Sequence, residues 1–118
     1  MKARVQVKVY LVDERGEHLM GMGVLGLLAG IERRHSILQA AKGMKMSYMK
    51  AHAVLKRLER GLGGRLVARW HGGAGKGGAE LTPFARDLLA RYARHNERVA
   101  ALARKEFAPL IKRLGRLR

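Results

Sequence analysis

The chain has 118 residues, 47% of them hydrophobic, which suits one domain with a single thin core. It has no cysteine, which excludes disulfides and thiolate metal ligands and fits a reducing cytoplasm. Lysine and arginine total 25 against 9 acidic residues, a formal net charge of +16, so the surface repels itself unless an anionic partner such as nucleic acid or a membrane covers it.

The N-terminal residues alternate between polar and apolar side chains. Every second residue from Val5 to Leu11 is apolar, which predicts a half-buried strand over residues 4–12. Residues 13–16 contain Asp and Gly and predict a turn, and residues 17–20 predict a short returning strand. This charged, alternating start is not a signal peptide.

Helix signals follow the predicted hairpin. Ser36 precedes Gln39 by three residues, a capping box that predicts the start of a short helix. Ser47 is the next N-cap candidate, and Gly63 follows the apolar pattern that begins there. The predicted helices cover about residues 22–34, 36–44 and 47–61. The last two, in tandem with a tight turn, predict a helix-turn-helix, although an ordinary αα-hairpin gives the same pattern.

A glycine-rich loop separates two further strand patterns. Residues 65–71 predict one strand and residues 79–81 its return, so residues 72–78, with Lys76 among glycines, form the tip of a hairpin, or wing. The loop is not a phosphate-binding P-loop. The first glycine of that motif would fall on Trp70, and no Ser or Thr follows the lysine.

Thr82 and Pro83 are a strong helix start, and no breaker follows until Pro109. A helix of about 25 residues is roughly 37 Å long and outreaches a small core. We therefore expect its second half to pair with another copy of the chain; the alternative is that its apolar face packs on its own core. The candidate interface residues, spaced as in a coiled coil with an asparagine inside the stripe, are Leu88, Leu89, Tyr92, Asn96, Val99, Leu102 and Ala103.

The charge around the predicted helix-turn-helix and wing has one sign. Between Ala40 and Gly78, Glu59 is the one acidic residue. The basic residues there are Lys42, Lys45, Lys50, Lys56, Arg57, Arg60, Arg65, Arg69 and Lys76. A solvated helix face usually mixes signs, so this surface favours contact with phosphates. The histidines have no metal-ligand spacing, and no nucleophile–base pair or carboxylate dyad appears, so we expect no enzyme, metal or cofactor.

The sequence resembles the N-terminal DNA-binding domain of molybdate-responsive ModE-type regulators. The resemblance rests on residues 46–51 (Met-Ser-Tyr-Met-Lys-Ala), residues 66–69 (Leu-Val-Ala-Arg), the glycine-rich loop with Lys76, and residues 81–82 (Leu-Thr). The domain of LysR-type regulators is more distantly similar. The glycine-rich wing followed by Leu-Thr is the most specific part and favours the ModE type.

The resemblance implies a winged helix, a homodimer joined by long helices and an inverted-repeat operator. In the family, the start of the recognition helix and the wing contact DNA. These roles carry over to Ser47, Tyr48, Met49, Lys50, His52, Lys56 and Lys76.

The sequence departs from the family in two places. Lys45 stands where the turn before Ser47 usually has glycine, so either Lys45 is left-handed or the turn differs in shape. Full-length regulators carry molybdate-binding domains after the long helix, where this sequence ends, so we expect a stand-alone domain without a bound ligand.

These observations predict an α+β fold, a winged helix-turn-helix with an N-terminal β-hairpin and a long C-terminal dimerisation helix. The expected parts are a DNA-binding domain (residues 1–82), a dimerisation helix (83–108) and a basic tail (109–118). The expected function is that of a cytoplasmic, homodimeric transcriptional regulator that binds double-stranded DNA and no membrane. The alternatives are an architectural, nucleoid-type DNA-binding protein of low specificity, and a basic membrane-surface or protein-interaction module.

Overall fold

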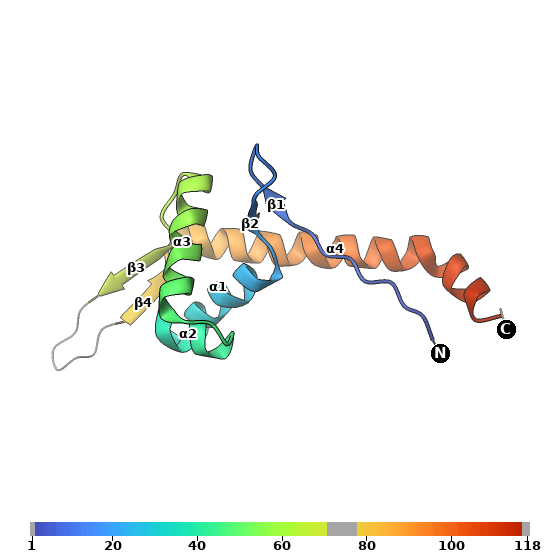
Figure 1. Ribbon diagram of the computed structural model, residues 1–118, viewed down its shortest axis with the longest axis horizontal. Helices are drawn as coiled ribbons and strands as arrows, with labels where there is room; N and C mark the ends of the chain where they lie inside the picture. The colour runs from blue at the N-terminus through green and yellow to red at the C-terminus, as the bar shows by residue number, and fades with distance from the viewer. Residues whose placement is uncertain (1, 71–77, 117–118) are drawn as a thin grey trace.

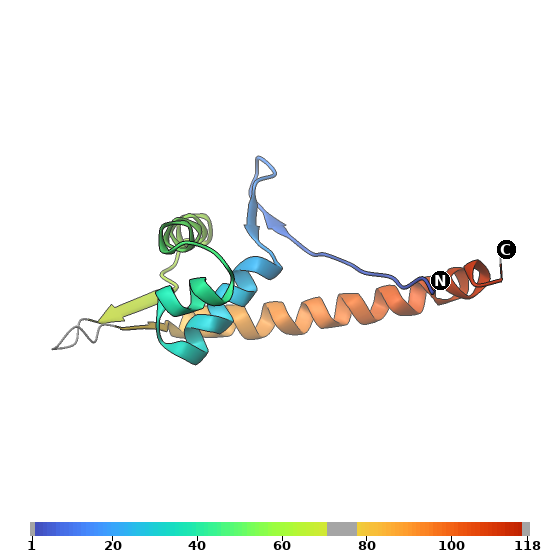
Figure 2. The same ribbon diagram turned by 60° about the horizontal axis from the view of Figure 1, so that its bottom comes forward.

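The computed structural model describes residues 2–70 and 78–116. Its elements are β1 (Leu11–Val12), β2 (His18–Met20), α1 (Met22–Arg34), α2 (Ile37–Gly43), α3 (Tyr48–Leu62), β3 (Val67–Trp70), β4 (Gly78–Leu81) and α4 (Pro83–Leu114). Figures 1 and 2 show α1, α2 and α3 gathered around the first turns of α4, with β3 and β4 projecting from one side and the rest of α4 from the other.

Three helices begin where the sequence predicts them. The hydroxyl of Ser36 accepts the Gln39 N–H, that of Ser47 accepts the Lys50 N–H, and that of Thr82 accepts the Ala85 N–H, each at 3.1 Å. Each hydroxyl thereby satisfies one of the N–H groups that a helix start leaves without a partner.

The structure shows which of the two alternatives for the turn between α2 and α3 is correct. Lys45 is left-handed, with φ of 56°, although it is not glycine. The Met46 N–H bonds the Ala41 carbonyl at 3.0 Å across this turn. The left-handed conformation costs a side-chain-bearing residue about 1–2 kcal/mol, and it lets α3 follow α2 without a longer loop.

One apolar core joins the compact part of the molecule. Its fully buried large side chains are Met20, Leu27, Leu28, Ile31, Leu58, Leu66 and Leu81. The small residues Ala40 and Ala41 of α2, Ala51 of α3 and Ala85 of α4 complete it. A β-carbon on Gly30 of α1 would lie 3.0 Å from Cβ and 3.3 Å from Cα of Ala40. The backbones of α1 and α2 are therefore in near contact.

The predicted strand over residues 4–12 is wrong in extent, because only Leu11 and Val12 pair with a neighbour. Residues 5, 7 and 9 are still half-buried and residues 4, 6 and 8 exposed. The segment lies along α4, and the Tyr92 hydroxyl donates to the Val9 carbonyl. Alternation records a half-buried extended segment, but a strand also needs a partner strand, which periodicity does not supply. Burial, and secondarily Tyr10, raises the pKa of the Tyr92 hydroxyl.

The predicted end of the long helix is also wrong. Helix α4 continues through Pro109 to Leu114, so most of the predicted tail is helical. Pro109 removes one N–H and crowds the carbonyl four residues earlier. This part of α4 is exposed and can bend to relieve that clash, and its last turns bend away from the axis in Figure 1.

The remaining architecture agrees with the prediction. Strands β3 and β4 pair antiparallel, with Val67 opposite Leu81 and Trp70 opposite Gly78, and α4 begins directly after β4. The α+β winged helix-turn-helix with an N-terminal hairpin and a long C-terminal helix is confirmed.

Two glycines of α1 offer a matched test of the contact with α2. We expect Gly30→Ala to destabilise the protein by about 1–2 kcal/mol, because the crowding on Ala40 outweighs the gain in helix propensity. We expect Gly23→Ala, whose new methyl group meets nothing within 4 Å, to stabilise it by about 0.5–1 kcal/mol. Urea unfolding measures both, and equal stabilisation by the two substitutions would contradict the close packing.

Candidate nucleic-acid interface

The outer surface of α3 carries the predicted recognition residues. Ala51, Leu55 and Leu58 are buried on the opposite side. Met49, at the first turn, is 76% exposed, and Lys50 and Lys56 are also exposed. The structure therefore presents an apolar, flexible side chain at the start of the helix, with Lys50 next to it in the chain and Lys56 two turns further along.

Tyr48 and His52 lie together on one flank of this surface. Their ring centroids are 6.1 Å apart, with an interplanar angle of 32°. Glu59 follows on the same flank and bonds the chain just before β3, so this flank faces the wing. Ser47 is occupied as the N-cap of α3, and its hydroxyl is engaged by the Lys50 N–H.

Two further residues of α3 share the outer surface but were not among the predicted contacts. Ala53 and Arg60 are exposed and lie one turn after Met49 and Lys56, respectively. Ala53 is small enough to let another surface approach the middle of the helix. The i, i+4 spacing from the predicted residues was the signal that would have identified both.

Glu59 connects α3 to the chain just before β3. Its Oε2 accepts the part-buried Leu66 N–H at 2.7 Å, and its Oε1 lies 3.7 Å from Nζ of Lys56. The one acidic side chain of this region therefore has a structural partner on each side. It also offsets part of the Lys56 charge, while Lys50 has no such neighbour in the described part of the chain.

The base of the wing is fixed to the rest of the domain by backbone bonds. The Ala79 N–H bonds the His35 carbonyl at 3.0 Å, and the Thr82 N–H bonds the Leu66 carbonyl at 2.9 Å. The Thr82 hydroxyl also donates to the Arg65 carbonyl at 2.7 Å. The hairpin is thus tied to the C-terminal end of α1, and the start of α4 to the segment that leads into β3.

Positive charge on this side of the molecule is largely unpaired. Arg57 of α3 pairs with Glu17, while Glu32, Glu80 and Asp87 pair with Arg86 and Arg91 of α4. Within residues 2–70 and 78–116, no ion pair involves Lys42, Lys45, Lys50, Arg60, Arg65 or Arg69. Arg65 and Arg69 line a hollow of about 120 Å³ with Lys56, between α3 and β3. Both arginines belong to the basic surface expected from the sequence, but neither was among the individually predicted DNA contacts. The predicted wing contact at Lys76 lies outside the described residues.

The structure packs the first half of the predicted dimerisation stripe on the chain's own core and leaves residues of the second half exposed. Tyr92 is buried and Leu88 and Leu89 pack against the chain's own core, which is the alternative that the sequence left open for this face. The Asn96 amide donates to Sδ of Met22 at 3.2 Å, also within the chain. Val99 and Leu102 are 40% and 65% exposed, and Ala103 is half-buried, so the second half of α4 retains an open apolar surface.

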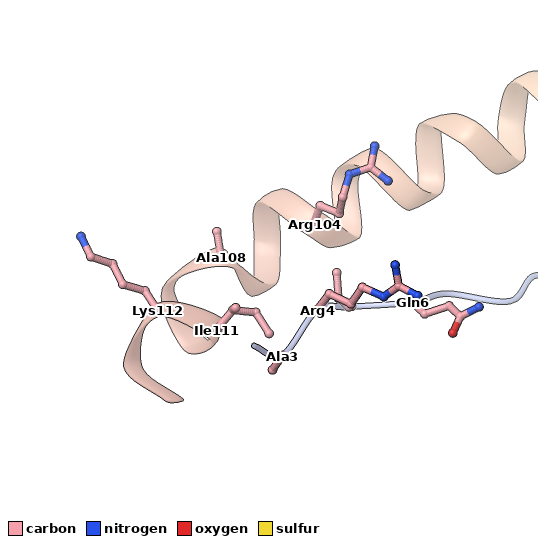
Figure 3. A pocket seen from close by; sticks show the side chains of 8 residues that line it. Ala3, Arg4, Gln6, Arg104, Ala108, Ile111 and Lys112 are labelled. Carbon is pink, nitrogen blue, oxygen red and sulfur yellow. The ribbon is translucent and has the colours of Figure 1, made fainter. Parts of the chain in front are cut away.

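A hollow of about 590 Å³ lies away from the basic surface, between the N-terminal segment and the second half of α4 (Figure 3). Arg104 and Lys112 line it from the helix, and their side chains point away from the N-terminal segment in Figure 3. Because these cations do not converge, the hollow lacks the arrangement of an anion site.

Two kinds of site are absent from the described ranges. No group of three or more His, Cys, Asp or Glu side chains is placed to hold a metal ion there. No helix among the described residues is long and apolar enough to cross a membrane.

Comparisons with known proteins agree with this geometry. No protein-family model matches the chain. The molybdenum-pterin-binding protein MopB of Rhodobacter capsulatus is 36% identical over 92 residues, which are 78% of this chain and 34% of MopB, so the chain spans about a third of that relative. The DNA-binding domain of CbnR, solved in a complex with DNA, has a TM-score of 0.62 and 23% identity, over 77% of this chain and 99% of that one. The second likeness shows the winged-helix fold, and together they confirm the resemblance to ModE- and LysR-type winged-helix domains.

The bond from Glu59 to Leu66 can be tested with two substitutions. We expect Glu59→Ala to lower the free energy of unfolding by about 1–3 kcal/mol, because the part-buried Leu66 N–H then lacks an acceptor. Glu59→Gln keeps an acceptor oxygen and is expected to cost less than half as much. Chemical denaturation of the two variants measures the difference, and equal losses would show that the carboxylate acts through charge alone.

Proposed function

We propose that this winged-helix domain of the ModE and LysR type is a sequence-specific transcriptional regulator, which binds an inverted-repeat operator in double-stranded DNA as a homodimer. The observation that carries the proposal is the set of unpaired cations around α3 and β3, from Lys42 to Arg69. Such a surface attracts the phosphates of a duplex and releases their counterions. The DNA complex of the CbnR domain supports the same partner.

Sequence discrimination rests on two uncharged side chains of α3, the exposed Met49 and the half-buried His52. An α-helix fits the major groove of B-DNA and presents its N-terminal residues to base edges. Met49 offers an apolar contact suited to the thymine methyl group, and His52 offers ring nitrogens that can donate or accept. A purely architectural protein needs only the cations, so these residues favour the regulator.

The second half of α4 supports the homodimer. Val99, Phe107, Leu110 and Leu114 are each at least 40% exposed, and with the half-buried Ala103 they follow one another at intervals of three or four residues along one face. Burying a leucine or phenylalanine side chain contributes about 1.5–3 kcal/mol. A second copy aligned on this stripe would bury it and place two recognition helices about a common axis.

Selection of bound sequences from random duplex DNA near physiological salt tests the function. We expect an enriched inverted repeat that the protein binds about 10³–10⁷-fold more tightly than unrelated duplex. Enrichment of no motif, with similar affinity for every duplex, would support the architectural alternative and contradict the proposal.

Substitution of His52 separates base reading from attraction to the backbone. We expect His52→Ala to cost about 1–3 kcal/mol of binding free energy at a subset of operator positions and little on random DNA. Lys50→Ala is the matched control on the same helix. It should weaken both duplexes alike and lower the slope of log K against log salt by about one. An equal effect of His52→Ala on both duplexes would reassign this histidine to backbone contact or packing.

The dimer is tested with α4 residues that do not belong to the chain's own core. We expect the unmutated protein to sediment at equilibrium at twice its 13.1 kDa chain mass. Phe107→Asp with Leu110→Asp should yield monomer, since two charges would lie in the apolar stripe. Ala101→Asp, exposed and outside the stripe, should leave the dimer intact. A 13.1 kDa species for the unmutated chain at micromolar concentration would contradict the dimer.

A further inference from the structure

A hollow of about 230 Å³ opens between the start of α2, the start of α3 and the base of the wing. Leu38, Tyr48 and Trp70 line it and are 45%, 39% and 41% exposed, respectively. Arg69 lines the same hollow. Large apolar side chains gathered on a surface of unpaired cations indicate a partner with both apolar and anionic parts.

Trp70 is held in this hollow by a glycine rather than by the core. It lies opposite Gly78 in the β3–β4 register. A β-carbon on Gly78 would overlap Cζ2 and Cε2 of the indole, so the ring lies against the Gly78 backbone. This packing covers part of the indole, and the part still exposed contributes to the wall of the hollow. Trp70 is therefore positioned, yet left open to a partner.

The place of the hollow identifies its occupant, given the proposed function. The hollow separates α3, which would enter the major groove, from β3 and β4, which lead to the wing. Between two adjacent grooves of a duplex runs a single sugar–phosphate strand. That strand has the required chemistry, because the deoxyribose is largely apolar at its surface and the phosphate is anionic.

We propose that this hollow binds one sugar–phosphate unit of the DNA strand that runs between the recognition helix and the wing. The deoxyribose packs against Trp70, Tyr48 and Leu38, and the guanidinium of Arg69 contacts the phosphate. In the described part of the chain Arg69 has no carboxylate partner that would compete for this role. Such a contact carries no sequence information and fixes the register of the domain on the duplex.

Trp70 itself reports on the proposal, because it is the one tryptophan of the chain. Duplex DNA is titrated into the unmutated protein, and tryptophan emission is recorded together with the anisotropy of a labelled duplex. We expect the emission to change and to saturate with the anisotropy, for the selected operator and for an unrelated duplex alike. Bound duplex with unchanged emission overturns this inference and leaves the proposed function standing. Absence of binding to every duplex overturns both.

Variants then separate the two halves of the contact. We expect Trp70→Ala to weaken binding about tenfold on both duplexes with an unchanged salt slope, since the lost contact is apolar. Trp70→Phe should retain most of the affinity. Arg69→Ala should weaken both duplexes and lower the salt slope by about one. Phe84→Ala removes an aromatic ring of similar exposure, 45%, at the start of α4 and away from the hollow, and it should leave affinity unchanged.

Two outcomes contradict the assignment of a sugar–phosphate unit. A loss for Trp70→Ala that is confined to particular operator positions would show that the hollow reads a base. Full affinity for Trp70→Ala, with unfolding unchanged, would show that the indole serves only to cover Gly78.

Discussion

The near contact between the backbones of α1 and α2 is the constraint on which the rest of the structure depends. Gly30 has no side chain and Ala40 only a methyl group, so the helices approach until their backbones nearly touch. Helix α2 leads into α3 through the left-handed turn at Lys45, so the place of α2 determines the place of α3. A larger residue at Gly30 would move α2, and with it the surface that we propose to meet DNA.

The charged side chains of the described residues lie outside the apolar core. The buried residues of the described part of the chain are apolar or small, with no buried charged side chain, so the cations lie on the surface. A net charge of +16 on 118 residues opposes the compact state through self-repulsion. Cations without an ion-pair partner among the described residues lie around α3 and β3 and also along the second half of α4, and an anionic partner at α3 and β3 would relieve part of that repulsion.

Local signals in the sequence predicted the helices well, because the physical causes are local. The caps at Ser36, Ser47 and Thr82 each join residues three positions apart. The N-terminal strand was overestimated because strand formation depends on a distant partner. The predicted interface stripe on α4 proved to be part core and part exposed surface, because helical spacing alone does not tell which apolar residues pack on the chain's own core.

The hollow at Trp70 depends on contacts that no local pattern contains. It forms only when the β3–β4 register brings Gly78 opposite Trp70, and when α2 and α3 present Leu38 and Tyr48 beside them. The one sequence signal for this hollow was an aromatic residue, Trp70, at the end of a predicted strand and ahead of a run of glycines. The outer surface of α3 was easier to predict from the sequence, since the 3.6-residue period of a helix assigns each residue to a face.

We propose that one surface, made of the start of α2, the outer side of α3 and strand β3, meets duplex DNA. Backbone amide chemical shifts, recorded as the selected duplex is added to the full chain, locate this contact residue by residue. We expect the largest shifts to cluster from Ser36 to Leu38, along the first three turns of α3, and from Val67 to Trp70. Shifts clustered instead on the N-terminal segment and the second half of α4, with α3 unaffected, would contradict it.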